Sequence, residues 1–153
     1  MAIPVDVFDQ LLEVSVLLHA DMARAFAGTG LTTSRTHLLW ELHRLGPSTQ
    51  QALASAMKVT PRNVTGLVDA LESHGYVERR PHPTDRRALQ VTLTDRGSRT
   101  MAAMESDREQ AAAELVAGLT EQELDQFGRV LTSVTDRLRR LVEAAAVETG
   151  ETS

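Results

Sequence analysis

Arginine side chains cluster in one stretch of the sequence, between residues 60 and 94. Five arginines lie there: Arg62, Arg79, Arg80, Arg86 and Arg87. A guanidinium group donates two parallel hydrogen bonds to a phosphate or to the edge of a guanine, so such a cluster is typical of a surface that contacts a polyanion. The whole chain nevertheless carries a formal net charge of -5.

The charge is unevenly distributed along the chain. Residues 31–99 contain ten Lys and Arg against six Asp and Glu, a balance of +4, while the two flanks together carry -9. A basic middle suits a polyanion such as double-stranded DNA, and the acidic ends indicate a different task. The alternative is a random scatter of surface charge.

The polar residues that follow Thr60 have the chemistry of a helix that reads DNA. Thr60 can cap a helix whose first residue is Pro61, a position that tolerates the missing N–H of proline. In the major groove, arginine reads guanine, asparagine reads adenine and threonine contacts the methyl group of thymine. A solvated polar helix face would have a similar composition, so the position of this helix in the fold must distinguish the two interpretations. The predicted major-groove residues are Thr60, Pro61, Arg62, Asn63, Thr65 and Gly66.

A proline-rich segment, PHPTDRR over residues 81–87, separates two short apolar segments. Its prolines cannot donate ladder hydrogen bonds, which predicts that the whole segment is the stiff tip of a hairpin. Asp85 can pair with Arg87 and aim it into a minor groove, whose negative potential attracts an inserted arginine. Arg79 and Arg80 precede the tip and are better placed for phosphates. The alternative is a surface loop with ordinary ion pairs, which contribute little stability.

These side chains require elements that position them, and residues 31–99 predict three helices followed by a hairpin. A capping box at Ser48, or Thr49 alone, opens the second helix, and His74 with Gly75 ends the third. This order predicts a winged helix-turn-helix, a mainly α fold with a small β-hairpin wing, of the α+β class. The predicted elements are helices over residues 33–45, 50–57 and 60–73 and strands over residues 76–80 and 89–93.

Long helices flank this predicted DNA-binding domain. Residues 5–27 and 101–119 show helical spacing, and a capping box formed by Thr120 and Glu123 opens a last helix. Apolar residues in the last helix alternate at spacings of three and four, a heptad seam that packs against other helices. We therefore predict a homodimer, and the alternative is a monomer that folds its own ends together. The predicted dimerisation region covers residues 1–30 and 100–153, with the seam residues Leu124, Phe127, Leu131, Val134, Leu138 and Leu141.

The run VTPRNVTGLVDALESHGYVERRPHPTDRRALQVTLTDRG, residues 59–97, closely resembles the signature of the MarR family of transcriptional regulators. Helices before and after it fit the family layout, so the resemblance covers nearly the whole chain. It implies a symmetric dimer that binds a pseudo-palindromic operator in double-stranded DNA, usually as a repressor that a small ligand releases. It also implies that residues 60–69 form the major-groove helix.

The wing residues can be carried over by position, with one departure elsewhere. Asp85 and Arg87 match the paired wing-tip residues of the family, with Arg87 entering the minor groove and Arg86 supporting it. Gly66 stands where many relatives have an arginine on the recognition helix. Arg62, one turn earlier, is the candidate replacement for that contact, so the operator sequence cannot be taken from relatives.

The resemblance further implies an effector pocket between the dimerisation helices and the winged domain. His37, Trp40 and Arg44 share one face of a predicted helix, at spacing i, i+3 and i+7. They could bind an aromatic carboxylate by stacking and charge-assisted hydrogen bonds. The alternative is that Trp40 packs in the core or a dimer interface while the other two are solvated. His19 in the first predicted helix is similarly ambiguous.

Other function classes find no support in the sequence. With no cysteine, thiol redox sensing is excluded, and the five histidines show no H-x-x-x-H spacing for a metal site. No nucleotide-binding glycine loop or nucleophile motif is present, so we expect neither an enzyme nor a cofactor. No apolar run reaches the roughly 18 residues of a membrane span, and no secretory signal opens the chain, so we predict a cytoplasmic protein. The rival function is a winged helix used only for protein docking or structure.

Overall fold

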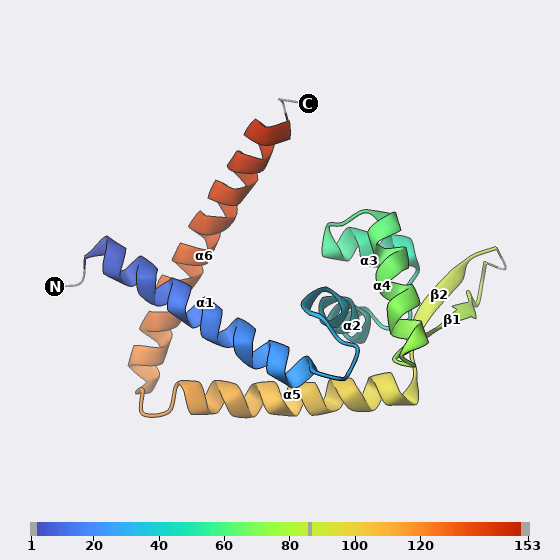
Figure 1. Ribbon diagram of the computed structural model, residues 1–153, viewed down its shortest axis with the longest axis horizontal. Coiled ribbons are helices and arrows are strands. Elements are labelled where there is room, and N and C mark those ends of the chain that lie inside the picture. Colours follow the sequence, from blue (N-terminus) through green and yellow to red (C-terminus); the bar gives the residue numbers. More distant parts are fainter. Residues whose placement is uncertain (1–2, 86, 151–153) are drawn as a thin grey trace. The chain divides into compact units, whose positions relative to one another are not determined.

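The computed structural model of the protein describes residues 3–85 and 87–150. The chain forms two compact units, Met1–Glu105 and Ser106–Ser153. The order of the elements confirms the predicted mainly α fold with a β-hairpin wing (Figure 1). Within the described residues, every helix is too short or too polar to cross a membrane. The elements are α1 (Pro4–Phe26), α2 (Thr33–Leu45), α3 (Gln50–Met57), α4 (Pro61–Ser73), β1 (Val77–Pro81), β2 (Leu89–Leu93), α5 (Asp95–Leu115) and α6 (Glu121–Gly150).

The core of the first unit lies between α2, α3, α4, the hairpin and the start of α5. Most of its apolar side chains lie on one face of α2 or of α4, because residues three and four apart share a face of a helix. Leu45, three residues after the buried Leu42, is 44% exposed, since α2 ends there and Gly46 follows as its C-cap. The fully buried large side chains are Leu38, Leu39, Leu42, Leu53, Val64, Val68, Leu71, Val77, Val91 and Met101.

The caps of α3 and α4 place the two helices of the helix-turn-helix. Thr49 caps α3, with its Oγ1 accepting a hydrogen bond from the N–H of Ala52 at 3.2 Å. The predicted capping box at Ser48 is wrong, because Ser48 pairs through its backbone with Val91 of β2 instead. Thr60 caps α4 as predicted, and Pro61 is the first residue of that helix.

The wing is an antiparallel hairpin in which Val77 lies opposite Leu93 and Pro81 lies opposite Leu89. The prediction that Pro81 belongs to the tip is wrong, since it is the last residue of β1. A proline is tolerated there because an end position of a strand does not need its N–H. Figure 1 shows the hairpin projecting beyond the helices of its unit.

α5 begins six residues before the predicted start at residue 101. The hydroxyl of Thr94 accepts a hydrogen bond from the N–H of Gly97 at 3.0 Å and so caps the first turn. A Cβ at Gly97 would lie 2.0 Å from the carbonyl oxygen of Tyr76, so only glycine lets this turn approach the start of the hairpin. The helix also ends earlier than predicted, at Leu115.

The second unit contains the end of α5 and the long helix α6. The predicted capping box is confirmed: Glu123 Oε2 accepts hydrogen bonds from the N–H and the hydroxyl of Thr120 at 2.9 and 2.8 Å, and Thr120 Oγ1 accepts one from the N–H of Glu123 at 3.3 Å. The two bonds from Thr120 lower the pKa of Glu123 below its usual value. Within this chain the six seam residues of α6 are 38–63% exposed.

Candidate nucleic-acid interface

The exposed face of α4 carries the predicted major-groove residues. Val64, Val68 and Leu71 are fully buried and anchor the opposite face of the helix in the core. The hydroxyl of Thr65 donates a hydrogen bond to the carbonyl oxygen of Pro61 at 3.0 Å, and the residue is exposed. A Cβ added to Gly66 would meet no atom within 4 Å. The exposed residues of this face are Thr60, Pro61, Arg62, Asn63, Thr65 and Gly66.

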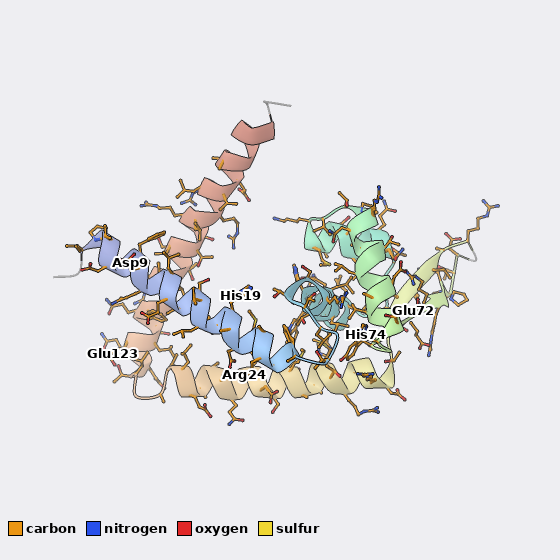
Figure 2. All side chains as sticks on the ribbon, in the orientation of Figure 1. Asp9, His19, Arg24, Glu72, His74 and Glu123 are labelled. Atoms are coloured by element: carbon orange, nitrogen blue, oxygen red, sulfur yellow. The ribbon has the colours of Figure 1, made fainter. Side chains whose placement is uncertain are left out.

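Arg79 of β1 binds two carboxylates of the same helix, Asp69 and Glu72. Its guanidinium donates to Asp69 Oδ1 at 2.5 Å, to Glu72 Oε2, and to Gln50 Oε1 of α3 at 3.2 Å. The backbone N–H of Arg79 also donates to Glu72 Oε1 at 3.1 Å. Figure 2 shows Glu72 towards the C-terminal end of α4, on the side of the hairpin. This residue cluster (Gln50, Asp69, Glu72 and Arg79) connects the wing to α3 and α4, and we call it the Arg79 clamp. We call α3, α4 and the wing together the reading head.

The Arg79 clamp changes the role predicted for Arg79. Burial works to lower the pKa of its guanidinium, but the hydrogen bonds and charges of Asp69 and Glu72 outweigh burial and raise that pKa. The side chain is 21% exposed and its hydrogen-bond donors are directed at protein carboxylates. This geometry makes Arg79 a structural link within the chain, and its role as a phosphate ligand stays a prediction. Sequence reasoning missed the link because its partners lie seven to 29 residues away.

Arg80, the next residue, faces solvent. Its side chain is 63% exposed and pairs with Glu78 at 2.5 Å, two residues earlier on the same face of the strand. An exposed pair of this kind is weakly held, so its guanidinium can exchange the carboxylate for a phosphate.

The wing tip brings Asp85 and Arg87 together, through the backbone. Asp85 Oδ1 accepts a hydrogen bond from the N–H of Arg87 at 2.9 Å. The carboxylate therefore orders the main chain at Arg87, whereas the sequence predicted a pair between the two side chains. Arg87 is exposed. Arg86, predicted to support it, lies outside the described residues.

Two of the three predicted effector residues, His37 and Arg44, lie next to the carboxylate of Glu41. Glu41 accepts hydrogen bonds from Arg44 at 2.6 and 3.2 Å, and the Nε2 atom of His37 lies 3.7 Å from it. Trp40 packs partly buried against the core and meets the ring of His43 edge to face, with centroids 6.2 Å apart. Glu41 was missed, although its spacing of four and three residues from His37 and Arg44 predicts these pairs. Its charge opposes a bound carboxylate at this face.

A hollow of about 340 Å³ lies elsewhere in the first unit, where α1 ends and α2 begins. His19, which Figure 2 shows on α1, contributes an imidazole to it. None of the three predicted effector residues lines it. Among the residues that the structure describes, no group of three or more His, Asp or Glu could hold a metal ion. The hollow is lined by His19, Ala23, Phe26, Ala27, Leu31, Thr32 and Thr33.

Comparison with known proteins identifies the family of this fold. The model of the MarR family matches residues 31–89, from the start of α2 to the start of β2. An HTH-type transcriptional regulator of Mycobacterium tuberculosis is 31% identical over 113 residues, which cover 74% of this chain and 76% of the relative. The chain belongs to the MarR family. The predicted resemblance is thereby confirmed, and the protein is a transcriptional regulator.

Two further relatives of this MarR-family protein are informative. The HTH-type transcriptional repressor YetL of Bacillus subtilis is 29% identical over 138 residues, covering 87% of this chain and 81% of YetL. The crystal structure of Streptococcus pneumoniae FabT in complex with DNA has a TM-score of 0.78 at 20% identity, covering 88% of this chain and 96% of FabT. The likeness to FabT shows the winged-helix fold. The predicted domain limits, the cytoplasmic location and the absence of catalysis stay predictions.

Proposed function

We propose that this MarR-family regulator is a homodimer that binds a pseudo-palindromic operator and represses transcription until a small ligand releases it. The observation that carries the proposal is the exposed polar face of α4, held in one compact unit with an arginine-bearing hairpin. FabT, which shares the fold, was crystallised with DNA, and this supports DNA binding. YetL is a repressor, and this supports repression.

In this proposal α4 enters the major groove. Arg62 and Asn63 lie in its first turn, where a recognition helix contacts base edges. Arg62 has the donors to read a guanine, and Asn63 has the donor and acceptor to read an adenine. Thr65 is exposed on the same helix, and its methyl group has the chemistry to contact the methyl group of a thymine.

The wing supplies the flanking contacts. Arg87 enters the minor groove from a tip whose backbone is already ordered, and Arg80 contacts a phosphate from the exposed face of β1. Arg79 takes no direct part, because the Arg79 clamp uses its donors. The supporting role of Arg86 stays a prediction from the family resemblance.

The dimer buries apolar surface that a single chain leaves in contact with water. α1 has no buried residue, and the seam of α6 is exposed along its length. Each of the two helices therefore has an exposed apolar face, which a second copy of the chain would cover. With two-fold symmetry the two copies of α4 would read half-sites about 10 base pairs apart on one face of the duplex.

The effector is proposed to bind in the hollow between α1 and α2. Phe26, Ala23 and Leu31 give it an apolar wall, and His19 and two threonines add hydrogen-bonding groups. This lining suits a small aromatic molecule with one polar or acidic group, and its volume of about 340 Å³ lies in the range of small-molecule sites. The predicted site at His37, Trp40 and Arg44 is less suited, because the carboxylate of Glu41 already pairs with Arg44 and lies beside His37.

The test is a binding titration with DNA selected from a random pool and with the region upstream of the protein's own gene. We compare Arg62→Ala and Arg87→Ala with Arg139→Ala, an exposed arginine on α6 that pairs with Asp136. Both reading-head variants should weaken binding. Each arginine lost from the neighbourhood of a DNA phosphate should lower the slope of log affinity against log salt concentration by about one ion. Arg139→Ala should bind as the wild type does.

Two results would count against the proposal. Wild-type protein without salt-dependent DNA binding would favour the rival, a winged helix used for protein docking. Equal affinity of wild type and Arg87→Ala would remove the wing from the interface. Release by aromatic acids, screened on the complex, tests the effector separately.

A further inference from the structure

The imidazole of His82 closes the tip of the wing. Its Nδ1 atom lies 3.3 Å from the backbone nitrogen of Thr84, 3.2 Å from the hydroxyl of Thr84 and 3.2 Å from the backbone nitrogen of Asp85. Both backbone N–H groups donate to this one nitrogen. The side chain of His82 is half-buried, whereas Thr84, Asp85 and Arg87 are exposed.

This arrangement requires one form of the imidazole ring. A neutral imidazole has a single nitrogen that accepts, with one lone pair in the ring plane. Three donors share that lone pair, which agrees with the long distances of 3.2–3.3 Å. Nδ1 must therefore carry no proton, and the pattern assigns the ring proton to Nε2. A proton on Nδ1 would face two N–H groups and open the tip.

From His82 the hydrogen bonds continue to Arg87. Asp85, held by its N–H, uses Oδ1 to accept from the N–H of Arg87 at 2.9 Å, and its carbonyl oxygen accepts from the N–H of Ala88 at 3.1 Å. The carbonyl oxygen of Ala88 in turn accepts from the N–H of His82 at 3.0 Å. The imidazole thus joins a closed set of bonds between the end of β1 and the start of β2.

The neighbouring prolines explain why a side chain is needed for this closure. Pro81 and Pro83 have no N–H, so the first backbone donors after His82 are those of Thr84 and Asp85. Among the residues of this turn that the structure describes, the acceptor given for both N–H groups is the imidazole and not a backbone carbonyl. An Asn or Asp side chain can accept the N–H two residues on in the same way.

We propose that His82 is a positioning residue for operator binding, which holds the tip of the wing closed so that Arg87 is presented to the minor groove. This role rests on the proposed function. It does not require His82 to touch DNA. Nothing in the basic composition of the wing predicts it, because the effect passes through the backbone of Asp85 and Arg87.

The test uses the full-length protein and a selected operator duplex. His82→Ala removes the acceptor and should weaken binding about three- to tenfold, the loss expected for one or two weak hydrogen bonds. His82→Asn restores a neutral acceptor and should bind within about twofold of the wild type. His43→Ala removes an imidazole from α2 that lies near Thr92 and Leu93, at the end of β2 away from the tip. It is the matched control and should leave the affinity unchanged.

A second readout needs no DNA. Long-range ¹⁵N–¹H correlation spectra of the free protein should show His82 as the neutral tautomer protonated at Nε2. Equal affinity of His82→Ala and wild type, failure of His82→Asn to restore binding, or a proton on Nδ1 would each overturn the proposal. Wild-type protein that selects no DNA would instead overturn the proposed function, and the tautomer would still decide whether the tip is closed.

Discussion

Arg79 and Arg80 are adjacent in the chain, yet they face different surroundings. Successive residues of a strand point to opposite faces, so Arg79 faces α4 and is 21% exposed, while Arg80 faces solvent and is 63% exposed. The residue type predicts only that both carry a charge. The face of the strand decides that Arg79 holds the reading head together and that Arg80 is available to a ligand.

Loss of the Arg79 clamp should cost stability. Arg79→Met keeps the length of the side chain but leaves Asp69 and Glu72 without their cation, and we expect the free energy of unfolding to fall by about 1–2 kcal/mol. Arg80→Met breaks only an exposed pair and should change it by less than about 0.5 kcal/mol. Urea unfolding of both variants measures the difference. Similar losses in the two variants would contradict the structural role of Arg79.

Gly66 and Gly97 are expected to respond in opposite ways to alanine. A Cβ at Gly66 meets no atom within 4 Å on the exposed face of α4, and glycine inside a helix is unfavourable by about 0.5–1 kcal/mol relative to alanine. Gly66→Ala should therefore raise the midpoint of thermal unfolding. Gly97→Ala should lower it, because the new atom would lie 2.0 Å from the carbonyl oxygen of Tyr76. A destabilised Gly66→Ala would show that this glycine has a packing role.

At the scale of elements, the ends of the helices are set by local hydrogen bonds. Thr49, Thr60 and Thr120 each accept a bond from an N–H three residues later, and α3, α4 and α6 start directly after them. Such caps satisfy backbone donors that have no partner within the helix. The start of α5 differs, because its first turn also depends on the fit of Gly97 against Tyr76.

The cap of α6 should make stability depend on pH. The pKa of Glu123 is lowered by its bonds from Thr120, so the carboxylate stabilises the folded state above its usual pKa of 4.5, and this contribution is lost as the pH falls through the lowered value. Glu123→Gln should unfold at a lower temperature than the wild type at pH 7. The difference should shrink as the pH falls through the lowered pKa of Glu123, because Glu123 then becomes neutral like glutamine. Thermal unfolding followed by circular dichroism across this pH range measures it, and an unchanged difference would contradict the assignment.

At the scale of the whole molecule, each of the two compact units leaves large apolar side chains exposed. α1 exposes large apolar side chains along its length, and none of its residues is buried. Burying such surface gains roughly 25 cal/mol for each Å² removed from water, which favours association with a second copy. This exposed surface supports the proposed homodimer.

A charge in the seam of α6 should separate the proposed dimer. Leu131→Glu places a carboxylate among the seam residues, and we expect a monomer by sedimentation equilibrium together with a large loss of operator affinity, because the two reading heads are no longer linked. Ser133→Glu adds the same charge about half a helical turn away from the seam, so it should remain dimeric. A dimeric Leu131→Glu variant would place the interface elsewhere.

The sequence by itself determined the order of helices and strands, most of their limits and the family. These depend on capping residues, prolines, glycines and apolar spacing, which act over a few neighbouring residues. The tertiary structure alone decided the contacts between distant residues: Arg79 with Gln50, Ser48 with Val91, and Gly97 against Tyr76. It also decided that Asp85 binds the backbone of Arg87. Spacing in the chain does not specify these contacts, because they depend on which surfaces meet once the core has packed.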